Sequence, residues 1–383
     1  MSKWAGKYVI GLTGNIGTGK SVVRRMLEHL GAYGIDADAL SHRAIAKGAP
    51  GYQPIVQMFG RWILAPDGQI DRARLGKVVF SDLAALAELE KIVHPLVDQA
   101  IDIIVRRSTQ PVVVIEAIKL LEVGLAKQCD SVWVTYAPAQ EQIARLVKNR
   151  RMSEADARRR IEAQTAQEQK IAAATVVIKN TGTFENTWRQ VQAAWQKLVG
   201  HAEESTPAPA AAAPAAKTLE GEIRVVRARP RQSAEIAVLI TRLSKGKREM
   251  RAEDVMAAFG EKAFLLLQVG STPAGLIGWQ VENLVARTTD ILIDPALPLE
   301  KAVPALITEM ERASKDLQSE ASLVFVDEPL TKMDPVWRSL GYERRAPDQL
   351  GVQAWQEAAL ESMPDGCQLF FKQLRIDRVL RPI

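Results

Sequence analysis

The chain has 383 residues, of which 47% are hydrophobic and 25% are charged. This balance is typical of a folded globular protein and excludes a disordered or collagen-like chain. The length predicts two domains. The longest apolar runs are far shorter than the roughly 20 residues that a membrane span requires, so no interaction with a membrane is predicted.

Positive charge is concentrated in the first half of the chain. Residues 1–200 contain 27 Lys and Arg against 19 Asp and Glu, whereas residues 201–383 contain 23 against 26. This excess favours an anionic partner for the first half, either nucleic acid or a phosphorylated small molecule. Cys129 and Cys367 form no disulfide or metal framework, and no secretory signal is recognised. We therefore expect reduced thiols and a cytoplasmic location.

Strands and helices alternate along the first half. Apolar runs predict strands at residues 8–12, 33–35, 112–115, 131–135 and 176–178. Helical spacing predicts helices at residues 20–30, 97–105, 139–148 and 184–198. Buried-type strands that alternate with helices predict an α/β fold, in which a parallel sheet is covered by helices on both faces.

A linker separates this half from the rest of the chain. Eight of the sixteen residues 202–217 are Ala and three are Pro. Such a segment has almost nothing large to bury, and its prolines favour an extended backbone. The predicted organisation is therefore a first domain at residues 1–200, a linker at 201–220 and a second domain at 221–383.

A glycine-rich loop lies between the first predicted strand and the first predicted helix. Residues 14–21 fit the pattern G-x-x-x-x-G-K-[ST]. Glycines let the backbone N–H groups surround phosphate oxygens, and the helix N-terminus adds positive charge. Lys20 is expected to reach the β- and γ-phosphates of ATP, and Ser21 to ligate Mg²⁺. The predicted ATP contacts in this segment are Gly14, Asn15, Gly17, Thr18, Gly19, Lys20, Ser21 and Val22.

Three carboxylates come at or directly after the ends of predicted strands. Asp36 and Asp38 follow the second strand, and Glu116 follows the third. Ligands of open parallel sheets bind outside the carboxyl ends of the strands, so Asp36 and Asp38 are expected near the loop. A kinase needs a carboxylate to accept the proton of the attacking hydroxyl, and we assign this role to Asp38. Asp36 is interpreted as structural, and Glu116 either organises Mg²⁺ or is a surface residue.

Arginines cluster between residues 145 and 160. The guanidinium group suits phosphate recognition because it donates two parallel hydrogen bonds. We interpret the segment as a basic helical lid over ATP and assign Arg145 a catalytic contact with phosphate, together with Lys20. Residues 158–160 are interpreted as a solvated charged face. Because the arginines cluster at a lid and no motif for reading bases is recognised, nucleic-acid binding is not predicted.

These features together resemble the dephospho-coenzyme A (dephospho-CoA) kinase family over about residues 8–198. The resemblance rests on the ordered set of the phosphate loop, residues 35–38, residues 70–72 with 78–80, His94-Pro95, Arg145-Leu146 and residues 160–164. The family phosphorylates the ribose 3′-hydroxyl of dephospho-CoA with ATP, which is the last step of coenzyme A (CoA) synthesis. The resemblance implies this fold, this reaction and Mg²⁺ bound with ATP.

The resemblance also implies further site residues. Asn180 and Gly182 are expected beside the adenine of ATP, and His94-Pro95 is interpreted as a helix start near the acceptor site. The sequence departs from the family pattern at residues 116–122 and at Asn149. The implied substrate-binding residues are Asp38, Arg72, His94, Leu120 and Glu122.

The second half predicts a separate α+β domain. A strand opens it at about residue 223, and runs at 264–269 and 275–282 predict a hairpin. A strand at 290–293, a helix at 302–317, a strand at 323–326 and a short helix at 337–341 follow. This order resembles the GNAT acetyltransferase superfamily over about residues 221–345.

The acetyl-CoA loop of that superfamily has no good counterpart here. Residues 294–301 contain two prolines and two acidic residues and no glycine, so they form a poor cradle for pyrophosphate. We interpret the domain as a non-catalytic binding or regulatory module, with CoA or acyl-CoA as candidate ligands. The alternatives are another small-molecule or nucleotide kinase with the same loop, a regulatory protein that only binds nucleotide, and a bifunctional kinase and N-acetyltransferase.

Overall fold

The computed structural model describes residues 3–79, 81–150, 152–199, 221–282 and 284–376, without the side chains of residues 149 and 150. The predicted linker therefore lies outside the described residues, as do Phe80 and the side chain at the Asn149 departure. Within the described ranges, none of the helices combines the length and the apolar character that a membrane span requires.

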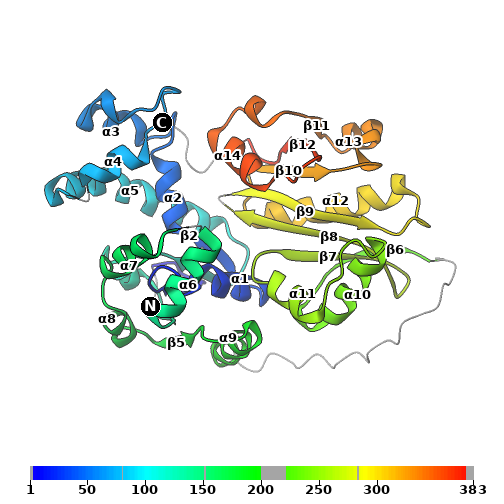
Figure 1. The fold of residues 1–383 in the computed structure, drawn as a ribbon, viewed down its shortest axis with the longest axis horizontal. Coiled ribbons are helices and arrows are strands. Elements are labelled where there is room, and N and C mark those ends of the chain that lie inside the picture. Colours follow the sequence, from blue (N-terminus) through cyan, green and yellow to red (C-terminus); the bar gives the residue numbers. More distant parts are fainter. Residues whose placement is uncertain (1–2, 80, 151, 200–220, 283, 377–383) are drawn as a thin grey trace.

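A five-stranded parallel sheet organises the first half (Figure 1). Its strand order is β2-β3-β1-β4-β5, and every pairing is parallel. The strands are β1 (Tyr8–Thr13), β2 (Tyr33–Asp36), β3 (Val112–Glu116), β4 (Ser131–Tyr136) and β5 (Val176–Lys179). All five agree with the strands predicted from the apolar runs, and the α/β fold is confirmed.

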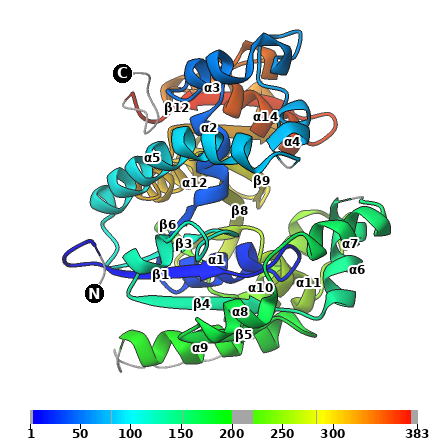
Figure 2. The ribbon, with the colours of Figure 1, turned by 90° about the vertical axis from the view of Figure 1, so that its left-hand side faces the viewer.

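Helices cover both faces of this sheet (Figure 2). Successive side chains of a strand point to opposite faces, so Val112 and Val114 pack on one side and Val113 and Ile115 on the other. Helices α1 (Lys20–His29) and α9 (Phe184–Val199) cover the first side. The second side is covered by α2 (Ala37–Ala44), α3 (Tyr52–Phe59), α4 (Arg72–Val79) and α5 (Leu83–Arg107).

Helix α5 corrects one sequence prediction. His94-Pro95 was expected to begin a helix, but both residues lie in the middle of the 25 residues of α5. Asp82 caps the true start, because its carboxylate accepts hydrogen bonds from Ala84 N and Ala85 N. Buried residues such as Val93 and Val97 on both sides of the proline hold the helix together despite the missing N–H group.

A seven-stranded sheet organises the second half, with the order β11-β12-β10-β9-β8-β7-β6. The strands are β6 (Ile223–Arg227), β7 (Ala263–Val269), β8 (Thr272–Glu282), β9 (Val285–Ile293), β10 (Ala321–Val326), β11 (Glu343–Arg344) and β12 (Gln368–Gln373). The helices are α10 (Ser233–Leu243), α11 (Ala252–Ala258), α12 (Leu299–Asp316), α13 (Asp334–Ser339) and α14 (Gln353–Ser362). The predicted α+β domain with its β7–β8 hairpin is thus confirmed.

Two elements at the end of the chain were not predicted. Strand β12 inserts between β10 and β11, and α14 packs beneath it through Trp355. The resemblance had been followed only to about residue 345, whereas this sheet is complete only at residue 373. Strand β9 pairs with β10 only through residues 285–287 and then diverges from it.

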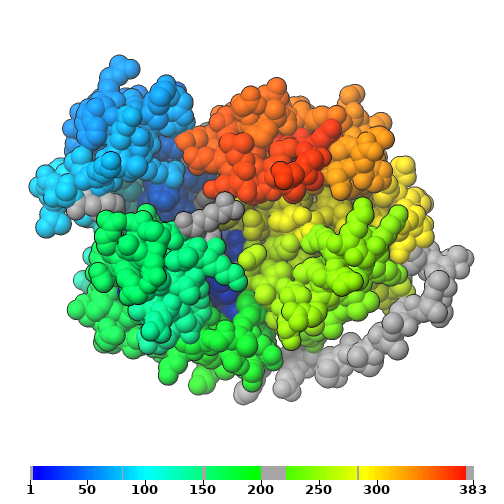
Figure 3. Space-filling view, viewed as in Figure 1, coloured from blue at the N-terminus to red at the C-terminus, as the bar shows by residue number. Residues whose placement is uncertain are grey.

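The two halves lie directly against each other (Figure 3). Helix α1 contacts the second half where the His29 ring packs edge-on against Phe259. The turn between α12 and β10 contacts β2, α2 and α5 of the first half.

Candidate active site

The glycine-rich loop lies between β1 and α1, as predicted. Gly14 has a φ of 148°, and a Cβ there would lie 2.3 Å from Thr135 Oγ1 and 2.6 Å from Thr135 O. Gly19 has a φ of 91°, and a Cβ there would lie 2.0 Å from Asn180 Nδ2. Glycine is therefore required at both positions by backbone angle and by space.

Neighbouring segments hold this loop in shape. Thr18 Oγ1 donates to Asn15 O at 2.7 Å and lies 2.7 Å from Thr135 Oγ1. Ile16 N donates to Gln164 Oε1 at 2.8 Å. Asn180 Nδ2 donates to Thr18 O at 2.9 Å. The loop is thus fixed from β4, from the segment that follows α7 and from the end of β5, and sequence motifs mark the last two of these segments.

Lys20 and Ser21 begin α1 in the neighbourhood of Glu116. Lys20 is buried, and its Nζ donates to Asn15 O at 3.3 Å. Ser21 Oγ donates to Glu116 Oε1 at 2.8 Å, and Arg24 Nε donates to Glu116 Oε2 at 2.7 Å. Glu116 is only 3% exposed, so the alternative that it is a surface residue is wrong.

Electrostatics keep Glu116 ionised. Burial alone would raise the pKa of Glu116, but the positive charges of Arg24 and Lys20 outweigh burial and hold this pKa below its ordinary value. Burial, followed by the charge of Glu116, raises the pKa of Asp36. Asp36 also caps α2, because its Oδ1 accepts from Ala39 N at 2.9 Å, which agrees with its structural interpretation.

Asp38 lies in the first turn of α2. Its Oδ2 accepts a hydrogen bond from Ile118 N at 3.2 Å, just beyond the end of β3. Burial raises the pKa of Asp38, and Lys20 is close enough to oppose this rise. The structure thus brings Asp38 and Lys20 into one electrostatic neighbourhood at the carboxyl ends of the strands.

The basic segment forms two helices beside the loop, α6 (Ala139–Arg150) and α7 (Glu154–Glu162). Arg145 donates to Gly17 O at 3.2 Å and to Asn180 O at 2.7 Å, so it joins the two segments predicted to hold ATP. Arg158 and Arg159 are exposed and pair with acidic neighbours on α7, in agreement with a solvated face. Ile16 packs against Leu146 and Ala157, which ties both helices to the loop.

The residues implied for substrate binding differ in burial and in the contacts that they make. Glu122 accepts from Thr165 Oγ1 at 2.7 Å. His94 is half-buried on α5, and Arg72 at the start of α4 lies 3.9 Å from Glu357 of α14. Leu120 is fully buried against Gly11 and Cys129. The Leu120 side chain is therefore a core residue in this structure, and its contact with substrate stays a prediction.

Three polar residues of the site were missed at the sequence level. Lys170 is 1% exposed, and its Nζ donates to Ile118 O at 2.7 Å and lies 3.5 Å from Glu122. Arg24 and Thr135 complete the contacts of Glu116 and of the loop. Arg24 could have been found, because it shares the α1 face of the buried Leu27 at helical spacing. Nothing in the sequence around Lys170 or Thr135 marks them.

Oxygen groups at this site suit a hard cation. Mg²⁺ is usually held by one or two protein oxygens together with substrate phosphates and waters. The Ser21 hydroxyl and the ionised Glu116 provide such oxygens at the start of α1. Among the described residues, no cluster of three or more His, Cys, Asp and Glu forms a protein-only metal cage. This donor set fits a cation that arrives with a nucleotide.

The loop between β9 and α12 differs from the phosphate loop. Its Ala296 N donates to Asp294 Oδ1 at 3.0 Å, and its Leu297 N donates to Asp294 O at 2.9 Å. Pro298 caps α12 without a side-chain hydrogen bond. These backbone donors therefore bond within the turn of the loop itself. This agrees with the prediction that the loop forms a poor cradle for pyrophosphate.

Comparisons with known proteins identify relatives of the first half of the chain. The family model described as dephospho-CoA kinase matches residues 8–186. A dephospho-CoA kinase from Geobacter metallireducens is 43% identical over 194 residues, which cover 50% of this chain and 96% of that protein. A solved structure from Thermus thermophilus is 32% identical, with a TM-score of 0.47, over 51% of this chain and 99% of that one. A GNAT-family acetyltransferase from Streptococcus pneumoniae is 12% identical, with a TM-score of 0.32, over 40% of this chain and 99% of that one.

Proposed function

Because this chain belongs to the dephospho-CoA kinase family, we propose that Asp38 is the base of the reaction that its first half catalyses. This reaction transfers a phosphoryl group from ATP to the ribose 3′-hydroxyl of dephospho-CoA and gives CoA and ADP. The observation that carries the assignment is the half-buried carboxylate of Asp38, which accepts from Ile118 N just beyond the end of β3 and lies within the electrostatic reach of Lys20 at the phosphate loop.

The proposed step is an in-line transfer. Asp38 accepts the proton of the ribose 3′-hydroxyl. At the same time the hydroxyl oxygen forms a bond to the γ-phosphorus, and the bond between that phosphorus and the leaving ADP breaks. Lys20 and the N–H groups of the loop neutralise charge on the phosphates. Arg145, which already contacts the backbone of Gly17 and Asn180, is proposed to contact phosphate.

Mg²⁺ and the acceptor complete the proposed site. Mg²⁺ bound with ATP would neutralise charge on the β- and γ-phosphates, and the Ser21 hydroxyl would hold it. Arg72, His94 and Glu122 are proposed to bind dephospho-CoA, with Asn180 and Gly182 beside the adenine of ATP.

The division into residues 1–200, 201–220 and 221–383 remains a proposal, as does a cytoplasmic location.

The decisive experiment compares two neighbouring aspartates. ADP release is measured on the full chain with ATP, Mg²⁺ and dephospho-CoA, and with adenosine, AMP, CMP and shikimate as rival acceptors. Turnover is expected only with dephospho-CoA, and Asp38→Asn is expected to lower kcat by about 1,000-fold. Asp36→Asn is the matched control, because asparagine retains the helix cap and the activity should remain within a few-fold.

Three results would contradict the proposed function or the role of Asp38 in it. Equal loss in both variants would indicate a general electrostatic role for this carboxylate pair. Turnover of a rival acceptor at a comparable rate would favour another small-molecule kinase. Nucleotide binding without any turnover would favour a regulatory protein.

For the second domain we propose a binding or regulatory role without acetyl transfer. The supporting observation is the loop of residues 294–298, whose Ala296 and Leu297 N–H groups bond to Asp294 rather than facing outwards. The candidate ligand is CoA or an acyl-CoA. Labelled acetyl-CoA titrated into the full chain, with the kinase acceptor site saturated by dephospho-CoA and without ATP, should bind at one further equivalent. Absence of saturable binding would exclude this ligand class.

A further inference from the structure

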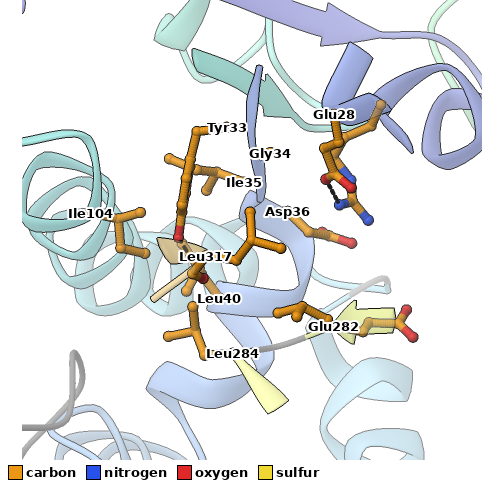
Figure 4. A pocket seen from close by; sticks show the side chains of 12 residues that line it. Glu28, Tyr33, Gly34, Ile35, Asp36, Leu40, Ile104, Glu282, Leu284 and Leu317 are labelled. Atoms are coloured by element: carbon orange, nitrogen blue, oxygen red, sulfur yellow. Dashed lines mark hydrogen bonds and ion pairs between the residues drawn. The ribbon is translucent and has the colours of Figure 1, made fainter. Parts of the chain in front are cut away.

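The turn that joins α12 to β10 is buried against the first half of the chain. Gln318, Ser319 and Glu320 of this turn are 6%, 0% and 0% exposed, although all three are polar. Leu317 packs against the core cluster formed by β2, α2 and α5. Figure 4 shows Leu317 among Tyr33, Leu40 and Ile104 of the first half. A polar turn would otherwise face water, so its burial makes the contact between the halves specific.

Hydrogen bonds fix the position of this turn. Tyr33 Oη donates to Leu317 O at 2.9 Å, and Gln318 Nε2 donates to Arg107 O at the end of α5 at 3.2 Å. Gln318 has a φ of 61°, a left-handed conformation that is uncommon for a residue other than glycine. On its own side, Glu320 N donates to Leu284 O at 2.7 Å, which anchors the turn to its sheet.

A buried ion pair crosses from this turn to α2. Arg43 Nη2 donates to Glu320 Oε2 at 2.6 Å, and the two side chains are 8% and 1% exposed. Charge-assisted bonds of this kind are the strong ones, and removal of one partner leaves a buried charge uncompensated. The pair therefore resists displacement of α2 relative to the second domain.

Helix α2 carries both this pair and the proposed base. It has only eight residues, and Asp38 and Arg43 project about 140° apart around its axis. Asp38 faces Ile118 and the phosphate loop, while Arg43 faces Glu320. The helix thus lies between the active site and the second domain. The orientation of α2 sets the position of the Asp38 carboxylate. A displacement of this carboxylate by about 1 Å is enough to slow proton transfer.

We propose that Glu320 of the second domain is a positioning residue for Asp38, acting through Arg43 and α2. This inference rests on the proposed role of Asp38. It predicts that the kinase reaction needs the second domain at one particular contact. Lys20 and the phosphate loop belong to β1 and α1, so the binding of ATP is expected to be independent of this pair.

The test is a double-mutant cycle in the full chain. Glu320→Gln and Arg43→Gln are each expected to lower kcat with dephospho-CoA by about tenfold, with the KM for ATP unchanged. The double variant should lose less than the product of the two single losses, because both single variants remove the same interaction. Arg43→Lys keeps the charge and should recover part of the loss. Circular dichroism at the assay temperature checks that each variant is folded.

A matched control separates positioning from stability. Glu311 of α12 is 6% exposed and accepts from Lys372 Nζ at 2.7 Å within the second domain. Glu311→Gln removes the ion pair of another buried glutamate, whose partner Lys372 is half-buried, without touching α2, so kcat should stay at the wild-type value. If Glu320→Gln unfolds the chain, Glu320→Asp replaces it and should give an intermediate loss.

Three results would overturn the proposal. They are wild-type kcat in both Glu320 variants, losses that multiply in the double variant, and an equal loss in Glu311→Gln. Failure of the proposed function is a different result, because the wild-type chain itself would then show no turnover with dephospho-CoA.

Discussion

Two connections in this chain have the same local plan and opposite chemistry. Each leads from a strand through a short loop into the N-terminus of a helix, β1 into α1 in the first half and β9 into α12 in the second. The helix N-terminus offers backbone donors in both places. The comparison teaches that this plan alone does not make an anion site, because the residues of the loop decide where the donors point.

The difference lies in glycine against proline. Gly14, Gly17 and Gly19 hold positive φ angles that wrap the first loop around a space for phosphates. In the second loop, Pro295 and Pro298 have no N–H group, and Asp294 accepts from the turn itself. The first loop therefore contains no carboxylate of its own, whereas the second contains one that already accepts from the turn.

The largest effect is expected when the first loop is made to lose a glycine. Gly14→Ala forces a Cβ to within 2.6 Å of Thr135 O at a φ of 148°. The free energy of unfolding should fall by about 3 kcal/mol and kcat by about 100-fold. Denaturant unfolding and ADP release measure the two quantities.

Gly31→Ala is the control for this variant. Gly31 also has a positive φ, 110°, but a Cβ there meets nothing within 4 Å. It should lose about 1–2 kcal/mol of stability from backbone strain and retain its kcat. A loss of kcat as large as that in Gly14→Ala would show that backbone strain, rather than contact with Thr135, is what matters.

A second prediction contrasts the pH dependence of two aspartates, the half-buried Asp38 and the buried Asp290. Burial raises the pKa of Asp38, so the acid limb of kcat should lie at higher pH than for an ordinary aspartate. In the pH range of this limb, the folded state binds more protons at Asp38 than the unfolded state does. The contribution of Asp38 to the free energy of unfolding therefore falls as the pH, and with it the activity, rises. Asp290 differs, because Lys262 and Arg248 outweigh its burial and hold its pKa below the ordinary value. Its contribution to stability is therefore lost as pH falls.

Parallel measurements of kcat and of unfolding against pH check this contrast. Asp38→Asn should remove the part of the stability change that follows the acid limb, and Asp290→Asn should leave that part in place. An acid limb at the pKa of an ordinary aspartate would refute the raised pKa of Asp38.

The smallest effect is expected in the second loop. Pro298 caps α12 without offering a side-chain acceptor. Pro298→Ser supplies a hydroxyl for the first-turn N–H groups and should raise the free energy of unfolding by about 0.5–1 kcal/mol. Thermal unfolding measures the gain, and kcat should be unchanged. A decrease in stability would mean that the rigidity of Pro298 outweighs the missing cap.

Features that depend on residues close together in the sequence were predicted, whereas features that depend on distant residues were not. The phosphate loop and β1–β5 were found because glycine spacing and apolar runs are local signals. The burial of Leu120 beside Gly11 was not predicted, because a motif position does not report burial. Lys170 was missed because its partners, Ile118 and Glu122, come from a distant part of the chain.

The same reasoning applies to the second half and to the contact between the halves. The β7–β8 hairpin is local and was found, whereas residues paired between β10 and β12 are at least 42 positions apart. Arg43 and Glu320 are 277 positions apart, and neither stands in a recognisable motif. Pairings of this kind depend on the completed fold, so no pattern of neighbours predicts them.

The buried pair of Arg43 and Glu320 also bears on the history of a fused gene. A kinase and a second domain joined by a linker can in principle separate again with little loss. Separation would remove the partner of each charge and expose to water the surfaces that now bury the pair. The fusion is therefore hard to reverse, because loss of either half also requires compensating substitutions in the half that remains.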